Sequence, residues 1–504
     1  MRSVHAGDAA GMKLHKRYPV LSDRQCGIMH EASCRLLEQV GIDVAHDKAR
    51  KLFLEAGAVE RNGRICIGRE MVDAAVENTA RTIQLGARDP NSVITLDPAG
   101  KPAVHFGTGG QALNVLHWED GAFAKRPAVT EDLIRILRLA QQLPHVDFIT
   151  RPVEPDVAEE EMDTTKARLF SENTTKHMNL ANLVCVDNLP RIVETVGDPS
   201  LISFISCLMV SPLHMVGDTT EKFMRIVRHD IPVAISSCAQ AGTTAPLSEV
   251  GEVVQVNAEV LSAVVLGNLI RPGARLLHRG LPITADLYSD GSPRWCQPDS
   301  IRRCAMMTDM TYYYGIPCCG TAGVSDEPLP SARAVAEKAL ALARITASGA
   351  QFVNSALGML ERIVTVCPEQ YVIDDTILSC IKKRFTSPGD EEDAADLCRM
   401  SVEDSLAALD VDPAPAGREI AARIDYVHGE REEISSDAME GRIASIEKAV
   451  ASSQSSTAFM RDARKGLRRG LLYRGSPIEG TLPLRRLHES VGDFIGKAQI
   501  PCAE

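Results

Sequence analysis

The sequence has no excess of positive charge and no long uncharged apolar segment. Lys and Arg total 55 against 67 Asp and Glu, which gives a formal net charge of −12. Nucleic-acid-binding proteins usually carry a basic patch, and polybasic membrane anchors carry clustered Lys and Arg, so this balance argues against both classes. The most apolar stretch, 253–270, is interrupted by Asn257, Glu259 and Asn268. We therefore expect no membrane-spanning helix, which needs about 20 consecutive apolar residues.

Signals for export and for nucleotide binding are also missing. Residues 1–20 contain no apolar core of the kind that a secretory signal needs. The 14 cysteines have no spacing typical of a disulfide framework, so we expect a reduced, cytoplasmic protein. No G-x-G-x-x-G or G-x-x-x-x-G-K-S/T motif follows a strand-like segment, which argues against nucleotide-binding folds. The glycine-rich residues 107–110 are more typical of a tight turn than of a phosphate cradle.

The chain does contain a regular alternation of strand-like and helix-like segments. Apolar strand-like runs occur at 146–150, 177–186, 202–210, 231–238, 274–280, 316–323 and 351–358. Most of them are followed by a segment of helical periodicity, of which 248–269 is the longest. A repeated strand–helix order predicts right-handed βαβ units and a parallel sheet buried on both faces. We predict an α/β fold of the (β/α)8 TIM-barrel type, with a doubly wound sheet as the alternative.

Two further regions flank the predicted barrel. Residues 1–129 are expected to hold helices and two β-hairpins, at 93–107 and 112–128, and Ser22 and Gln25 form a capping-box pair before the first helix. Residues 130–385 are the predicted barrel. Residues 386–504 open with an acidic linker and continue as polar helices, which predicts a C-terminal helical tail.

Several segments, in a fixed order, are distinctive enough to compare with a known family. They are 28–44, 52–59, 106–116, 126–149, 239–278, 313–340 and 349–361. The longest of them, 239–278, reads AQAGTTAPLSEVGEVVQVNAEVLSAVVLGNLIRPGARLLH. Together they resemble the trimethylamine methyltransferase family, which are corrinoid-dependent amine methyltransferases. The resemblance extends over roughly residues 20–385.

The resemblance implies a TIM barrel that moves a methyl group from an amine to Co(I) of a separate corrinoid protein. Members that demethylate trimethylamine carry pyrrolysine near the position of Gly323-Val324-Ser325, where this sequence has ordinary residues. Relatives without pyrrolysine include glycine betaine methyltransferases, which use quaternary amines. A quaternary nitrogen is already a cationic leaving group, so such an enzyme mainly binds a cation, excludes water and aligns the methyl group. The implied substrate is a betaine-like quaternary amine, and the implied cofactor is cobalamin carried by the partner.

Chemistry in a TIM barrel lies at the carboxyl ends of the strands, and this rule selects candidate substrate-binding residues. The segments after the predicted strands supply His214, Gln240, Asp286, Trp295, Val324, Asn354 and Ser355, and neighbouring regions supply Phe106 and Arg333. Because aromatic residues are only 4% of the chain, an ammonium cage would contain one or two rings.

Most of these candidates have both a functional and a structural interpretation. Trp295 is a wall of the cage through cation–π attraction, or an anchor of its loop. Asp286 complements the ammonium charge, together with oxygens of Gln240 and Asn354, or caps a turn. Arg294 and Arg333 are the candidates for pairing with a carboxylate tail. Arg333 is preferred because it stands where relatives have Gln; its alternative is a solvated residue in the first turn of a helix.

The remaining candidates are argued from position. His214 follows a predicted strand and contacts substrate or has a structural role. Val324 belongs to the loop expected over the barrel mouth, and Ser355 aligns with a His of relatives. Phe106 lies in the hairpin region that would cover the mouth.

The adjacent pair Cys318-Cys319 raises an alternative, a zinc-dependent thiol methyltransferase. Successive residues of a strand point to opposite faces, which favours a plain buried pair, so we expect no metal bound by this chain. A second alternative is a barrel without catalytic activity that binds a small cationic or zwitterionic metabolite. Expected partners are the corrinoid protein and the amine, with no nucleic acid and no membrane, and a homo-oligomer is left open.

Overall fold

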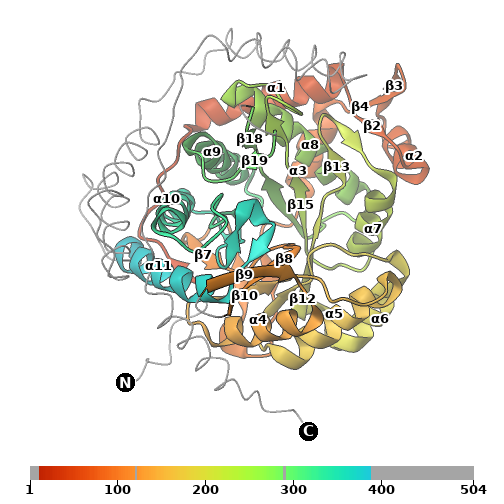
Figure 1. Cartoon of the computed structure of the whole chain (residues 1–504). Helices are drawn as coiled ribbons and strands as arrows, with labels where there is room; N and C mark the ends of the chain where they lie inside the picture. The colour runs from red at the N-terminus through yellow and green to blue at the C-terminus, as the bar shows by residue number, and fades with distance from the viewer. Residues whose placement is uncertain (1–10, 120–121, 288–290, 387–504) are drawn as a thin grey trace.

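The computed structural model describes residues 11–119, 122–287 and 291–386. The predicted tail lies outside the described residues except for Thr386. The described part is an α/β fold in which helices surround a central set of parallel strands, as Figure 1 shows. The α/β class expected from the sequence is therefore confirmed.

The centre of the described structure consists of two sets of parallel strands. One sheet contains, in order of pairing, β10 (Phe148–Thr150), β11 (His177–Asn179), β12 (Ile202–Ser206), β15 (Val233–Ser237) and β17 (Leu276–Gly280). The other contains β20 (Cys319–Thr321), β21 (Phe352–Asn354) and β7 (Ala103–Phe106), with β1 (Met12–Lys13) antiparallel to β7. Single parallel bridges, His278 with Cys318 and Gly107 with Phe148, join the two sheets at both sides.

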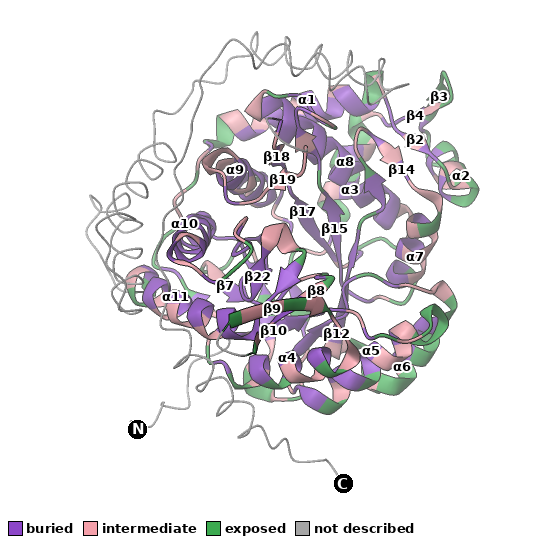
Figure 2. Ribbon diagram, in the orientation of Figure 1, coloured by how far each residue is buried: buried purple, intermediate pink, exposed green. Residues whose placement is uncertain are grey.

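Helices cover the outer face of these strands, and short strands extend past their carboxyl ends. The covering helices are α4 (Thr130–Gln142), α5 (Glu159–Asn173), α6 (Leu189–Val196), α7 (Gly217–Arg228), α8 (Glu249–Ile270), α9 (Pro298–Tyr314), α10 (Ala332–Ser348) and α11 (Pro368–Thr386). The short strands are β13 (Met209–Val210), β14 (His214–Met215), β16 (Gln240–Ala241), β18 (Ile283–Ala285), β19 (Pro293–Arg294), β22 (Met359–Leu360) and β23 (Thr365–Val366). In Figure 2 the central strands are buried, and exposed residues concentrate on outer helices such as α5 and α6.

Side chains alternate along each central strand between the helices and the interior. Val233 and Ile235 of β15 belong to the main core under the helices, whereas Ala234, between them, belongs to a small inner cluster. That cluster also takes in apolar side chains of the hairpin β5 (Ile83–Leu85) and β6 (Ile94–Leu96). The hairpin lies at the amino ends of the strands, because backbone hydrogen bonds link its neighbourhood to residues just before β12 and β17.

The N-terminal helices pack on the long helix α8. They are α1 (Asp23–Gln39), α2 (Asp47–Glu55) and α3 (Arg69–Asn78), accompanied by β2 (Asp43–Val44), β3 (Val59–Arg61) and β4 (Arg64–Cys66). The capping box of Ser22 and Gln25 is present at the start of α1, as predicted. Helix α8 is long and apolar enough to cross a membrane, but 89% of its most apolar window is buried inside the protein. Its apolar character is that of a core helix.

Two polar residues of α8 have hydrogen-bond partners inside the core, as buried polar groups require. The Asn257 side-chain amide donates to Ser33 Oγ at 2.9 Å and to the Tyr314 hydroxyl at 2.8 Å. The Glu259 carboxylate accepts from the backbone N–H of Leu213 at 2.9 Å and from other groups around it. These contacts connect α8 to α1, α9 and the loop after β12.

The structure differs from the sequence-based expectation in three places. The hairpin predicted at 93–107 is wrong, because β6 pairs with β5 whereas β7 pairs in parallel with β21. Alternation alone predicts a strand but does not choose its partner. The strand predicted at 177–186 ends at Asn179, and α5 was not predicted because its surface is largely polar. The second hairpin is confirmed as β8 (Asn114–Glu119) and β9 (Ala122–Pro127).

The stacked rings of Phe148 and Phe352 lie within the inner cluster, with centroids 3.6 Å apart. We predict that Phe352→Ala lowers the free energy of unfolding by about 3–5 kcal/mol, because it leaves a cavity where no neighbour can move in. Denaturant unfolding of the full chain measures this. Val59→Ala, at a site 50% exposed, is the control and should change stability by less than about 1 kcal/mol. A similar small loss for both variants would contradict the placement of the stack.

Candidate active site

Polar side chains replace apolar ones at the carboxyl ends of the central strands. Along β17 the inward positions are Leu277, in the inner apolar cluster, and then Arg279. The equivalent inward positions on neighbouring strands are Thr150, Ser236, Thr321 and Asn354, all buried. On these five strands the interior is thus apolar toward the amino ends and polar toward the carboxyl ends, where TIM-barrel enzymes hold their substrates. On β11 and β12 the inward residues at the amino end are polar instead, with His177 hydrogen-bonded to Ser203 at 2.8 Å.

Arg279 is the centre of this polar set. Its guanidinium donates to the hydroxyls of Ser236 and, at 3.0 Å, of Thr321. The Asn354 amide nitrogen lies 3.9 Å from the sulfur of Cys319 below it. Within the described residues, Arg279 Nε, Asn354 Oδ1 and Thr150 Oγ1 are buried without a hydrogen-bond partner. Unsatisfied buried polar atoms are costly, so this group is suited to a polar ligand.

The same end of the interior is open to solvent. Cys207 and Cys238 lie two residues after the inward-facing Ile205 and Ser236, and both are exposed. The surrounding protein nevertheless raises the pKa of the Cys238 thiol to about 12, because burial disfavours the thiolate. Both thiols thus lie where the buried polar set meets solvent. We use the name carboxyl-end recess for the part of the interior at which this set lies; its residues are Thr150, Cys207, Ser236, Cys238, Arg279, Thr321 and Asn354.

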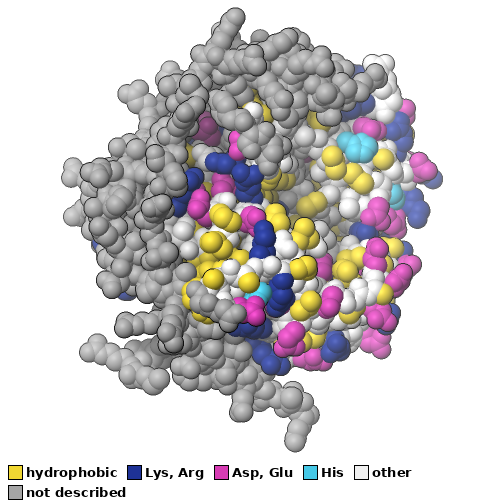
Figure 3. All heavy atoms as spheres, in the orientation of Figure 1, with side chains coloured by type: hydrophobic (Ala, Val, Ile, Leu, Met, Phe, Trp, Pro, Cys, Tyr) yellow, Lys and Arg dark blue, Asp and Glu magenta, His cyan; other side chains and the backbone are white. Residues whose placement is uncertain are grey.

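A cluster of charged residues lies on the loops beyond β17, β20 and β21. Arg294 bridges two carboxylates, with Nη1 3.1 Å from Asp286 Oδ2 and Nε 3.2 Å from Asp326 Oδ2. Arg362 Nη2 is 3.9 Å from the same Asp286 oxygen. The backbone N–H of Trp295 donates to Asp326 at 3.2 Å. Figure 3 shows basic and acidic side chains side by side near the middle of the face seen in Figure 1.

Some of the residues predicted from the sequence lie in the carboxyl-end recess or in the charged loop cluster, and others lie elsewhere. Asn354 lines the carboxyl-end recess, and Asp286 and Trp295 belong to the charged loop cluster. The Trp295 indole Nε1 is buried and has no hydrogen-bond partner among the described residues. Asp286 already has Arg294 and Arg362 as partners. Its negative charge is therefore balanced by arginines, and an ammonium group would have to compete with them.

Other predicted residues are packed in the main core. Phe106 is 2% exposed and Val324 is 1% exposed, and both contact the core under the helices. Ser355 is buried against Gly109, where any added side chain would collide with it. The absence of a side chain at Gly109 thus lets the loop after β7 lie directly against the end of β21.

Three further predicted residues lie on the surrounding loops and helices. His214 is paired through Nδ1 with Asp43 at 2.7 Å, where β14 joins β2 of the N-terminal region. Gln240 begins β16, and its carbonyl accepts hydrogen bonds within a tight turn. Arg333 lies in the first turn of α10, with Nε 3.2 Å from Glu337 and 3.4 Å from Glu327.

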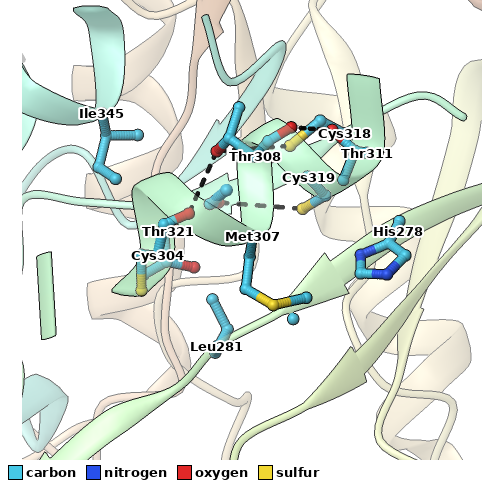
Figure 4. Close-up of a pocket in the computed structure, with 12 residues that line it drawn as sticks. His278, Leu281, Cys304, Met307, Thr308, Thr311, Cys318, Cys319, Thr321 and Ile345 are labelled. Carbon is cyan, nitrogen blue, oxygen red and sulfur yellow. Dashed lines mark hydrogen bonds between the residues drawn. The ribbon is translucent and has the colours of Figure 1, made fainter. Parts of the chain in front are cut away.

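Cys318 and Cys319 do not form a shared site. Cys318 contacts the main core and Cys319 the inner cluster, as expected for successive strand residues. Figure 4 shows the small cavity beside them, lined by Cys304, Met307 and Thr308 among others. Its volume of about 10 Å³ is the room of a single water molecule, so it is not a substrate site.

The His, Cys and acidic side chains that lie close enough to share a metal ion, within the described part of the chain, are His30, Cys34 and Asp73. His30 already contacts Asp73 at 2.9 Å and the Tyr314 hydroxyl at 3.2 Å. Burial raises the pKa of Cys34 to about 12, so the thiol stays protonated. These residues lie on α1 and α3, near the end of α9 that precedes β20, and are therefore separate from the carboxyl-end recess.

Sequence reasoning missed Arg279. The signal was present, because in the strand-like run ARLLHRG the residues Leu277 and Arg279 share one face. A cation at the carboxyl end of a strand otherwise made of buried residues is unusual. The same run also contains Arg275 and His278, so the sequence pattern by itself does not single out position 279.

Comparisons with known proteins agree with the resemblance found in the sequence. A family model described as trimethylamine methyltransferase (MTTB) matches residues 5–403. The trimethylamine methyltransferase MttB of Methanosarcina barkeri is 28% identical over 382 residues, 73% of this chain and 76% of that protein. The glycine betaine methyltransferase of Desulfitobacterium hafniense is 23% identical over 381 residues, 72% of this chain and 77% of that protein. A crystal structure of the hydroxylamine MtmB complex aligns with a TM-score of 0.47 and 12% identity, over 92% of this chain and 97% of that one.

Asp326 gives the charged loop cluster a measurable pH dependence. Burial, with a smaller effect of Glu337, raises the pKa of Asp326 from 3.8 to about 6. Between these values the unfolded chain is ionised while the folded chain keeps the proton, so this group's contribution to stability falls as the pH rises and is constant above about 6. We predict that the stability of the wild type relative to Asp326→Asn falls by about 3 kcal/mol between about pH 4 and pH 6. Denaturant unfolding of both proteins across this range measures it, and a constant difference would refute the raised pKa.

Proposed function

The chain belongs to the trimethylamine methyltransferase family and is a methyltransferase; we propose that its methyl donor is a betaine-like quaternary amine and its acceptor the corrinoid of a partner protein. The family match over residues 5–403 confirms the resemblance carried by the sequence. The donor is supported by the ordinary residues at 323–325, where members that demethylate trimethylamine carry pyrrolysine. It is also supported by the similarity to a protein named glycine betaine methyltransferase.

The observation that carries the proposal is the carboxyl-end recess. A corrinoid held by another protein has to approach from solvent, and the exposure of Cys207 and Cys238 indicates an opening of that kind. The polar wall formed by Arg279, Thr321 and Asn354 would hold the polar part of a small donor inside. The recess thus fits both the donor and an acceptor that arrives from outside.

The corrinoid supplies the electron pair that forms the new bond to the methyl carbon. As the C–N bond breaks, its electron pair stays on nitrogen and a neutral tertiary amine leaves. No proton has to move, so the protein needs no general acid or base for this step. Its contribution is to orient the donor, to exclude water and to stabilise the ammonium charge until the bond breaks.

Trp295 is the residue we assign to the ammonium group. It is partly buried and contacts the core, and its backbone is held by Asp326 in the charged loop cluster. An aromatic face attracts a quaternary ammonium by about 0.5–2 kcal/mol. The assignment is supported by the position of Trp295 on a loop after β17, at the carboxyl end of the strands.

We also infer that the central strands close into the (β/α)8 barrel. The two parallel bridges between the sheets, at Gly107 and at His278, support closure at both seams.

Methyl transfer to reduced cobalamin tests the function directly. We predict that the purified full chain demethylates glycine betaine and leaves dimethylglycine, and that trimethylamine is turned over at least about 100-fold more slowly because it lacks a cationic leaving group. The absorbance change of cobalamin and analysis of the amine product measure both rates. Comparable turnover of trimethylamine would refute the quaternary-amine assignment, and no transfer from any quaternary amine would favour a barrel that only binds its ligand.

A pair of substitutions at Trp295 tests the ammonium site. We predict that Trp295→Ala weakens binding of glycine betaine and choline alike by about 3- to 30-fold, because both ligands present the same trimethylammonium group to the ring. Trp295→Phe keeps an aromatic face and should lose less affinity for both ligands than Trp295→Ala does. Isothermal calorimetry measures the affinities. Unchanged binding by folded Trp295→Ala would remove this residue from the site.

A further inference from the structure

We infer that Arg279 binds a carboxylate of the methyl donor, so that the donor is an N-methylated amino-acid zwitterion and not a simple amine or an amino alcohol. This inference rests on the proposed function, because it assigns the same recess. It differs from the sequence-based expectation, which placed the carboxylate at Arg333.

The geometry leaves the guanidinium ready for a second set of acceptors. A guanidinium has five N–H donors in a planar fork. In the described structure, one is directed to Ser236 and one to Thr321, while Nε has no partner. The two hydroxyls hold the plane of the group, and the remaining N–H groups can take both oxygens of one carboxylate.

The charge of Arg279 is uncompensated within the described residues. Arg279 is 9% exposed, and no carboxylate is recorded within ion-pair distance of it in that part of the chain. Four of the other buried cations each have a carboxylate close by: Arg151 with Glu154, Lys166 with Asp163, Arg303 with Glu252, and Lys338 with Asp374. A fifth, Arg344, donates to the Tyr18 carbonyl at 3.0 Å. A buried charge without a counter-charge is strongly destabilising, so the surroundings of Arg279 indicate that an anion completes the site.

Neighbouring cysteines do not supply that anion. Burial raises the pKa of Cys319 to about 11 and that of Cys238 to about 12, so both thiols are neutral near pH 7. The other polar neighbours are hydroxyls and an amide, which carry no charge. Asn354 Oδ1 and Thr150 Oγ1, also buried without partners, are additional contacts for a zwitterion that enters the recess.

Arg333, by comparison, is already engaged. Its guanidinium lies within ion-pair distance of both Glu327 and Glu337 and is partly exposed. A carboxylate added there would compete with two existing carboxylates. At Arg279 the substrate carboxylate would meet a cation that has no recorded carboxylate partner among the described residues. We therefore assign the carboxylate site to Arg279 and not to Arg333.

Two matched ligands test the inference on the unmodified protein. Glycine betaine and choline share the trimethylammonium group and differ in a carboxylate against a hydroxymethyl group. We expect the full chain to bind glycine betaine at least about 30-fold more tightly by calorimetry, the range for hydrogen bonds to a charged group. Equal affinities would overturn the inference without requiring any variant.

Substitutions locate the effect. Arg279→Met should reduce affinity for glycine betaine at least about 30-fold and leave that for choline within about twofold. Arg279→Lys keeps the positive charge but loses the planar fork of N–H donors, so its affinity for glycine betaine should lie between those of the wild type and Arg279→Met. Arg275→Met, which changes an arginine just before the same strand, is the matched control and should leave both affinities unchanged. Because replacing an uncompensated buried charge with an apolar chain is neutral or stabilising, Arg279→Met should keep or raise Tm, which a purely structural role would not allow.

The outcomes separate this inference from the proposed function. If glycine betaine is demethylated and Arg279→Met retains its KM, the inference fails and the function stands. If Arg279 is needed to bind glycine betaine but no methyl transfer occurs, the inference stands and the function fails. Should Arg279→Met not fold, Thr321→Val removes one hydroxyl that orients the guanidinium. A loss of betaine affinity of about threefold or more, with choline unchanged, would then support the inference; no loss would overturn it.

Discussion

Each central strand has one face that packs against helices and one face that points into the interior. Most features of this protein follow from the different side chains that these two faces require. The outer face packs against helices and is apolar along its length, as Val233 and Ile235 show. The inner face is narrow and has to be filled by side chains at one end for the fold to be stable. The stack of Phe148 and Phe352, with the hairpin of β5 and β6, fills the amino end. The carboxyl end is thereby left for polar side chains and for solvent.

Most buried charges in the described part of the protein have either a counter-charge or several hydrogen-bond partners beside them. Buried charges on the helices are matched locally, as Lys338 and Asp374 illustrate at 2.9 Å on α10 and α11. Glu259, which has no cation beside it in the described structure, is instead surrounded by hydrogen-bond donors, and burial raises its pKa. Arg279 fits neither pattern. Among the described residues it has two hydroxyl acceptors and no recorded carboxylate partner, and it lies at the carboxyl ends of the central strands.

The charged loop cluster and the recess have complementary tasks. Arg294 joins Asp286 and Asp326, which fixes the segments that follow two central strands, β17 and β20, against each other. Fixing these loops positions Trp295 through its backbone contact with Asp326. The proposed methyl transfer from a cationic nitrogen needs alignment more than acid–base catalysis, and a fixed loop cluster at the same end of the strands as the recess would supply that alignment.

Sequence alone determined the α/β class, the positions of most strands and helices, the capping box at Ser22 and the family, because these depend on local periodicity and on residues in a fixed order. It also placed Asn354, Asp286 and Trp295 at or beyond the carboxyl ends of strands, where the structure has them; their role in binding stays a prediction. Tertiary structure decided the rest. The partner of β7 was not predictable, because alternation does not encode which strand lies beside it. The sequence shows that Arg279 shares a strand face with Leu277, but whether its charge has a carboxylate partner depends on residues far apart in the chain. Only the folded protein showed that Arg333 is matched and Arg279 is not.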